Sequence, residues 1–161
     1  MNIFVTNTDV KQCAADHCHV HQTKMIVEYA QLMSTVKREH GITDGVYMPT
    51  HKNHPSTRWV RERPGNYQWL YELWRELCSL YTKRTGKVHL TQSRCHNLAI
   101  KCSSEPIFDY AMLAMPFEHK QANVVKAYRS YMNAKFAEWL ARPKPMKLVF
   151  DKKPSWCTIA Y

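Results

Sequence analysis

The sequence contains little glycine and no long apolar run. Four glycines occur among 161 residues, and neither G-x-G-x-x-G nor G-x-x-x-x-G-K-[ST] is present, which excludes the common glycine-rich phosphate-binding loops. No apolar stretch approaches the roughly 20 residues that a membrane-spanning helix needs. Residues 1–6 are too short for a signal peptide and lack its basic start. We therefore expect a cytoplasmic protein with no membrane partner.

Acidic residues are also scarce. The chain has 13 Asp and Glu residues against 23 Lys and Arg residues, and its formal net charge is +10. A net positive field concentrates polyanions near a protein and speeds their encounter with it. The expected partners are therefore nucleic acid, DNA in particular, or a phosphorylated nucleotide. A basic protein with no such partner is the alternative.

The six cysteines include no C-x-x-C pair, and in a cytoplasmic protein we expect them to be free thiols. Cys13, His17, Cys18, His19 and His21 nevertheless crowd together, so a structural zinc site is an alternative. Their spacing is irregular, and no second pair at ligand spacing balances them. We favour buried cysteines with exposed histidines, and we expect no metal and no cofactor.

The apolar periodicity predicts a mainly α, compact single domain over residues 1–161. Residues 1–8 are predicted to form a short strand or an extended segment, and the Pro- and Lys-rich residues 144–161 an extended tail draped over the helices. The predicted helices are Asp9–Ala15 with Asp9 as its cap, Val20–Glu39, Thr57–Arg63, Pro64–Arg84, Leu90–Lys101 and Gln121–Ala141.

One face of the segment His19–Glu39 carries a row of polar side chains at helical spacing. The row consists of His21, Lys24, Glu28, Gln31 and Thr35. At 100° per residue these side chains fall within an arc of about 80°. The apolar face beside them is predicted to be core and consists of Met25, Ile26, Tyr29, Leu32, Met33 and Val36. An imidazole, a cation, an acid and an amide at the edge of the core make this row the candidate catalytic site.

Lys24 and Glu28 are four residues apart and are expected to pair across one helical turn. A surface ion pair of this kind contributes only about 0.3–0.5 kcal/mol. The alternative is a partly desolvated carboxylate beside a cation, which suits proton transfer or stabilisation of a cationic sugar. We favour the catalytic interpretation because His21 and Gln31 share the row, where Gln31 can orient a base or a water molecule.

A second candidate cluster lies in the loop before the helix predicted at 57–63. It comprises His51, Lys52, Asn53, His54, Arg58 and Trp59. Two imidazoles, an amide and two cations in a turn fixed by Pro55 suit an anion or a nucleobase, and Trp59 offers a stacking face. The alternative is that the tryptophan is core and the histidines are solvated. We expect nucleic-acid or phosphate binding here.

A third basic patch lies on the last long helix, where Lys126, Arg129 and Lys135 alternate with aromatic residues. Basic residues between core aromatics usually form a solvated face. Arg129 is the exception that we retain as a candidate phosphate clamp, because a guanidinium can bind phosphate through two hydrogen bonds.

Five sequence strings resemble a widespread family of small bacteriophage proteins. The strings are IFVTN-x-D, H-x-x-KMIVEYAQL-x-ST, PTHKNHP-x-x-x-W, AYRSY and the closing PSW, and they span nearly the whole chain. This resemblance implies a phage-encoded protein that acts in the bacterial cytoplasm.

The chain also resembles, more distantly, phage endonuclease V, the pyrimidine-dimer DNA glycosylase and abasic lyase. The matching stretches are Glu28-Tyr29-Ala30-Gln31-Leu32 and Pro154-Ser155-Trp156. The resemblance implies a small, basic, all-helical domain that acts on DNA. It also implies a catalytic carboxylate at the position of Gln31, so that Glu28, one turn earlier on the same face, has to replace it.

That family uses the α-amine of a small second residue as its nucleophile. Here Asn2 is bulky, so retention of Met1 is predicted and Lys24 is the substitute amine. The expected function is therefore a phage N-glycosylase-like enzyme acting on DNA bases or nucleotides. The alternatives are a non-catalytic accessory protein that binds nucleic acid, a nucleotide signal or a host defence protein, and a zinc-stabilised interaction module.

Overall fold

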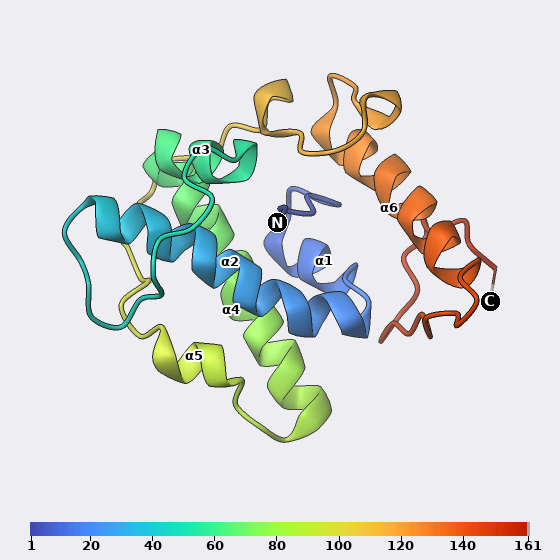
Figure 1. Cartoon of the computed structure of the whole chain (residues 1–161), viewed down its shortest axis with the longest axis horizontal. Helices are drawn as coiled ribbons and strands as arrows, with labels where there is room; N and C mark the ends of the chain where they lie inside the picture. Colours follow the sequence, from blue (N-terminus) through green and yellow to red (C-terminus); the bar gives the residue numbers. More distant parts are fainter. Residues whose placement is uncertain (161) are drawn as a thin grey trace.

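The computed structural model describes residues 1–160, which form six α-helices and two short 3₁₀ helices (Figure 1). The α-helices are α1 (Val10–Ala15), α2 (His19–Glu39), α3 (Pro55–Glu62), α4 (Pro64–Thr85), α5 (Leu90–Arg94) and α6 (Val124–Leu140), and the 3₁₀ helices are η1 (Tyr110–Met112) and η2 (Phe117–His119). Helix α4 packs against α1, α2 and α3. The predicted mainly helical, compact fold is confirmed.

The helix boundaries follow from local sequence. Asp9 caps α1 by accepting a 2.8 Å hydrogen bond from the backbone N–H of Gln12, as predicted. Helices α3 and α4 both begin with proline, whose fixed φ suits the first helical position. Gly86 ends α4 with a left-handed φ of 71°, which glycine adopts without a steric penalty.

The N-terminal residues form a buried extended segment, and the described residues 1–160 contain no β-strand. The segment lies between α2 and α6 (Figure 1). Arg129 of α6 donates a 2.8 Å hydrogen bond to the carbonyl of Thr6, and the Tyr128 hydroxyl of α6 donates one of 2.8 Å to Asn2. The extended alternative for this segment is therefore correct, and the segment attaches α6 to the rest of the molecule.

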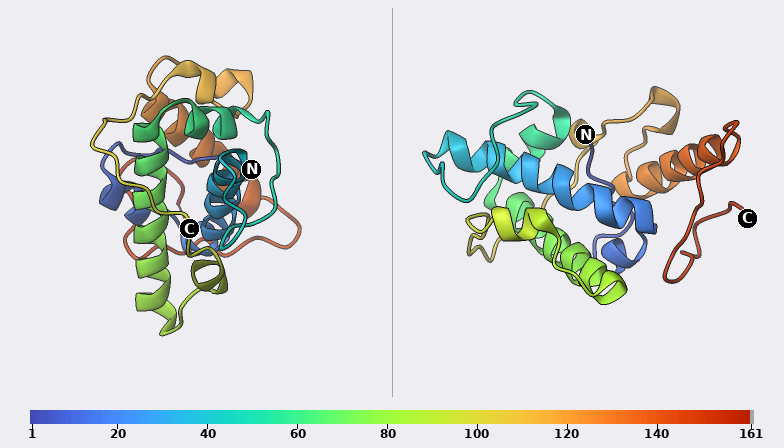
Figure 2. Two further views of the ribbon diagram at one scale, coloured as in Figure 1. Left: turned by 90° about the vertical axis from the view of Figure 1, so that its left-hand side faces the viewer. Right: turned by 60° about the horizontal axis from the view of Figure 1, so that its bottom comes forward.

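The tail contains no helix in its described part, residues 144–160, and turns back beside α6 (Figure 2). It is fixed to the start of α2 by a 2.9 Å hydrogen bond from Gln22 to Asp151. The indole N–H of Trp156 donates to Asp16 at 2.8 Å, just after α1. The predicted extended tail lies over the helices in this way, although Tyr161 falls outside the described residues.

The helix predicted at Leu90–Lys101 is wrong in length, because α5 ends at Arg94. Backbone carbonyls beyond that point accept hydrogen bonds from other elements. The Leu98 carbonyl accepts from the Tyr67 hydroxyl at 2.8 Å, and the Ala99 carbonyl accepts from Lys37 Nζ at 2.8 Å. These tertiary partners replace the i→i−4 bonds that would continue the helix.

None of the helices in residues 1–160 combines the length and the apolar character that crossing a membrane requires.

Candidate active site

The Glu28 carboxylate lies between two amino groups. Lys24 Nζ is 3.3 Å from its Oε1, and the amino group of Met1 is 3.9 Å from its Oε2. The Glu28 side chain is 15% exposed, whereas that of Lys24 is 65% exposed. The predicted pair across one turn is therefore present, but its carboxylate is mostly desolvated and has a second cationic neighbour. The Met1 amino group is not among the site residues that the sequence predicts.

Asn2 fixes the position of Met1. Its side-chain amide donates a 2.6 Å hydrogen bond to the carbonyl of Ala114, and its Oδ1 accepts from the Ile3 N–H and the Tyr128 hydroxyl, each at 2.8 Å. Asn2 is buried, so these bonds form where water does not compete with them. Asn2 therefore holds the amino group of the preceding Met1 in place.

A buried chain of hydrogen bonds attaches the N-terminal segment to α2. The Phe4 N–H donates to the Tyr29 hydroxyl at 3.2 Å, and this hydroxyl lies 3.1 Å from His17 Nε2. His17 Nδ1 lies 2.7 Å from the Cys13 carbonyl and therefore carries the proton, so its Nε2 accepts from Tyr29. Burial lowers the pKa of His17 to about 4, which keeps its ring neutral at pH 7.

His54 lies within the electrostatic reach of Met1 and Glu28. Its pKa is lowered chiefly by burial and further by the charge of the Met1 amino group and by His51, while Glu28 acts in the opposite direction. His54 Nδ1 accepts a 3.1 Å hydrogen bond from the Ser56 N–H at the start of α3. The neutral ring therefore carries its proton on Nε2. The loop histidine is thus near enough to the acid of the row for their charges to interact.

The loop before α3 is held against α2 by Thr35, the last member of the row. Thr35 Oγ1 accepts from the Thr50 N–H at 3.0 Å and lies 3.0 Å from the Thr50 carbonyl. Further along, the Thr57 hydroxyl donates to the His51 carbonyl at 2.8 Å. His51 has a left-handed φ of 48°, and its Nδ1 lies 2.6 Å from the Thr50 hydroxyl. Thr35 therefore has a structural role in placing this loop.

We expect Thr35→Val to destabilise the protein by about 1 kcal/mol, because it leaves the half-buried Thr50 N–H without its acceptor. Urea unfolding measures this loss, and amide hydrogen exchange at Thr50 should become faster. Thr43→Val is the matched control, since Thr43 is exposed and contributes only its backbone carbonyl to a hydrogen bond. Equal stability of the two variants would contradict the structural role of Thr35 in holding the loop against α2.

Gln31 lies between Glu28 and Thr35 on the same face. It is half-buried, and its side-chain amide makes no hydrogen bond to any residue in the described part of the chain. An amide free beside a desolvated carboxylate is available to orient a ligand or a water molecule.

His21 does not join the row, which corrects the prediction for this residue. Its ring is 2% exposed and contacts Phe4, Phe136 and Trp139 at centroid distances of 4.7, 5.9 and 4.9 Å. Its Nδ1 has no hydrogen-bond partner among residues 1–160. Helical spacing places His21 on the correct face, but α6 and the N-terminal segment cover the first turns of that face.

Trp59 and Arg129 are engaged in packing and backbone contacts. Trp59 is 2% exposed, stacks on Phe108 and donates its indole N–H to the Ile107 carbonyl at 2.6 Å, so it offers no face to a nucleobase. The core alternative for this residue is correct. Arg129 uses Nε to hold Thr6 in the N-terminal segment and thus fixes that segment.

Lys52, Asn53 and Arg58 remain exposed, as expected for binding residues. The Lys52 carbonyl accepts a 2.9 Å hydrogen bond from Arg61, which also forms a bidentate pair with Glu39 on α2. The loop is thus fixed through its backbone, and its charged side chains face solvent.

The Cys/His cluster near α1 does not form a metal centre. No group of three or more potential ligands converges anywhere in residues 1–160. Burial raises the pKa of both Cys13 and Cys18 to about 11, so their thiols are protonated at pH 7. His19 instead lies 3.0 Å from Asp151 in the tail.

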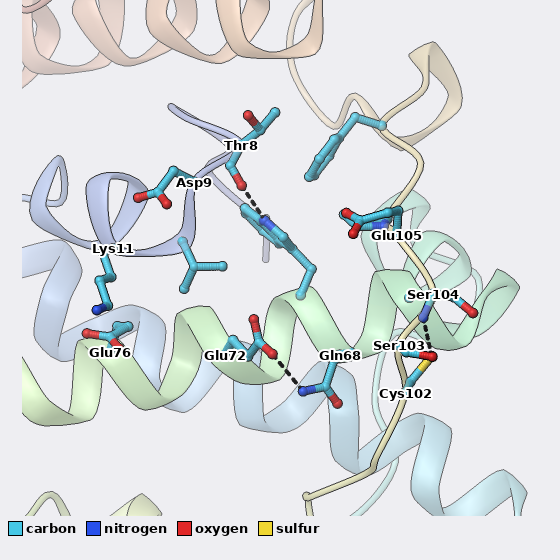
Figure 3. A pocket seen from close by; sticks show the side chains of 15 residues that line it. Thr8, Asp9, Lys11, Gln68, Glu72, Glu76, Cys102, Ser103, Ser104 and Glu105 are labelled. Atoms are coloured by element: carbon cyan, nitrogen blue, oxygen red, sulfur yellow. Dashed lines mark hydrogen bonds between the residues drawn. The ribbon is translucent and has the colours of Figure 1, made fainter.

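A hollow of about 1050 Å³ lies away from the row, between α1, α4 and the connector that includes residues 102–108. Figure 3 shows the carboxylates of Asp9, Glu72, Glu76 and Glu105 around it, with Lys11 as the one cation. Such a lining repels a polyanion. Of the two surfaces, the one around Glu28 and the loop at 51–54 is therefore the better candidate for nucleic acid.

No protein-family model matches the chain, and no curated protein or solved structure is detectably similar to it.

Proposed function

We propose that the protein is an N-glycosylase-like enzyme that cleaves the glycosidic bond of a DNA base or a nucleotide. The observation that carries this proposal is the desolvated Glu28 carboxylate between the Lys24 and Met1 amino groups. The geometry is that of a carboxylate that can stabilise a developing sugar cation while an adjacent amine or water attacks it.

Glu28 has two roles in the proposed reaction. Its negative charge stabilises the oxocarbenium-like sugar as the bond between C1′ and the base nitrogen lengthens. It also accepts the proton released by the attacking nucleophile, and the departing base takes up a proton. If the nucleophile is water, directed by Gln31, the products are the free base and an abasic sugar.

If the nucleophile is an amine, its ammonium form first loses a proton to solvent. The neutral amine then displaces the base at C1′ and forms a covalent amine adduct with the sugar, while Glu28 accepts the second amine proton and the base leaves with a proton from solvent. Ring opening then gives an imine that borohydride reduces. In a chain that begins at Met1, the α-amine is the better placed nucleophile, because Asn2 fixes it while the Lys24 side chain is largely solvated. The position of the Met1 amine thus favours it over Lys24, the amine that the sequence suggests.

The surrounding cations supply the binding surface in this proposal. Lys52, Asn53, His51 and Arg58 are exposed around the start of α3, in or directly after the loop whose His54 feels the charges of Glu28 and the Met1 amino group. Contacts from such residues to phosphates position a nucleic acid without reading its sequence. Extrusion of a base from a duplex costs a few kcal/mol, so damaged or mismatched bases are the favoured substrates.

The test combines base release with covalent trapping. The purified protein is incubated with damaged, modified and plain DNA and with nucleotides, and released bases are measured by mass spectrometry. Borohydride is added in parallel, and the trapped peptide is mapped, together with the N-terminal residue. We expect a released base and an adduct on Met1 that persists in Lys24→Gln and disappears when the N-terminus is extended by one residue.

An adduct on Lys24 would identify Lys24 as the nucleophile, and base release without an adduct would indicate hydrolysis by water. Salt-sensitive binding without release of any base would contradict the proposed activity. It would instead support the alternative of a non-catalytic nucleic-acid-binding protein.

A further inference from the structure

A second pocket lies between the C-terminal ends of α2 and α3 and the start of α4, away from Glu28. Its volume is about 430 Å³, which is within the range of small-molecule sites. Its apolar lining includes Val36, Val60, Tyr67 and Ile100. The nine-residue separation of Glu28 and Lys37 places their side chains on opposite faces of α2.

Lys37 in this pocket is a buried cation without a counter-ion. Its side chain is 9% exposed, and Nζ donates a 2.8 Å hydrogen bond to the Ala99 carbonyl and lies 5.8 Å from the centre of the Tyr67 ring. No carboxylate pairs with it among residues 1–160. Burial lowers the pKa of Lys37. An anion in the pocket would offset the cost of burying this charge.

The rim of the pocket is also cationic. Arg63 is exposed and makes no side-chain hydrogen bond or ion pair within the described residues, and His40 is exposed beside it. Arg61, the remaining cation, is neutralised by its bidentate contact with Glu39. The Tyr67 hydroxyl is bound to the Leu98 carbonyl and therefore adds no free donor. An apolar wall with one-sided charge and few hydrogen-bonding groups does not suit a nucleobase edge.

We infer that this pocket binds a small carboxylate with a planar apolar body, of the aromatic carboxylate class. The carboxylate accepts from Lys37 Nζ and is attracted by Arg63 at the rim. The planar body covers Val60 and Ile100 and loses little conformational entropy on binding. This inference does not depend on the proposed glycosylase activity.

The test is titration of the full chain with 2-naphthoate, followed by calorimetry and by amide chemical shifts. The neutral 2-naphthalenemethanol serves as the ligand control. We expect saturable binding of the carboxylate, at least tenfold tighter than that of the alcohol, with shifts at Val60 and Ile100. Lys37→Met keeps the aliphatic stem but removes the charge, and it should weaken naphthoate binding about tenfold without changing binding of the alcohol.

Two further variants keep the test decisive. Lys87→Gln removes an equal charge from an exposed turn and should leave naphthoate binding unchanged. Ile100→Trp fills the pocket without changing its charge and should abolish binding even if Lys37→Met proves unstable. Equal affinity for the carboxylate and the alcohol, binding that survives Ile100→Trp, or no binding at all would each overturn the inference.

Discussion

Glu28→Gln is expected to reduce glycosidic-bond cleavage by about 10²–10⁴-fold, the range typical for loss of a positioned catalytic acid or base. The substitution keeps the size of the side chain but removes the charge that stabilises the sugar cation and accepts the proton. The measurement is single-turnover release of base at saturating protein. Full cleavage by the variant would rule out Glu28 as the catalytic carboxylate.

Folding should be almost unaffected by the same substitution, which separates catalysis from structure. The Lys24 side chain is 65% exposed and stays hydrated when the charge of Glu28 is lost, so its pairing with Glu28 contributes no more than about 1 kcal/mol. Glu138→Gln is the matched control, because Glu138 pairs with Arg142 at the same i, i+4 spacing at the end of α6, where no catalytic role is proposed. It should leave cleavage intact. Parallel losses of stability and activity in Glu28→Gln would instead indicate a structural role.

The sequence predicts the polar row correctly where the helical repeat alone determines the direction of the side chains. Lys24, Glu28 and Thr35 lie on one face of α2 because the 3.6-residue repeat fixes their directions, and the six apolar residues beside them are buried as predicted. The helical repeat does not predict which distant segments pack over each turn of that face. His21 is buried by Trp139, which lies far along the chain on α6.

Other differences arise from contacts between distant segments. Trp59 is core because the connector brings Phe108 and the Ile107 carbonyl to it. The helix predicted after Leu90 ends early because α2 and α4 provide donors for its carbonyls. The Met1 amino group reaches Glu28 because Asn2 finds partners in Ala114 and Tyr128, and no local pattern predicts that pairing.

The two buried histidines should make the protein strongly sensitive to acid. Burial lowers the pKa of His17 to about 4 and that of His21 well below its usual value, and the charges of Lys135 and Lys24 lower the latter further. The ordinary value in the unfolded chain is about 6.5. The unfolded state therefore binds more protons below that pH, and stability is complete above about pH 6.5 and falls as the pH falls toward 4.

The size of this effect follows from the linkage relation. Lowering the pKa of His17 from about 6.5 to about 4 gives a slope that approaches 1.4 kcal/mol per pH unit in this range, so His17 should cost about 2 kcal/mol between pH 7.5 and pH 5. The lowered pKa of His21 adds to the loss in the same direction. This loss is a substantial part of the roughly 5–15 kcal/mol that typically stabilises a protein. Urea unfolding at pH 7.5 and pH 5 measures the difference directly.

His21→Phe tests which histidine is responsible. A phenyl ring fits among Phe4, Phe136 and Trp139, and it removes the unpaired Nδ1, so stability at pH 7.5 should be equal or higher. The part of the loss between pH 7.5 and pH 5 that is due to His21 should disappear, while His40→Gln, at an exposed histidine, should retain the whole loss. An unchanged loss in His21→Phe would mean that the His21 ring becomes protonated in the folded protein, which requires α6 to move away from α2 in acid.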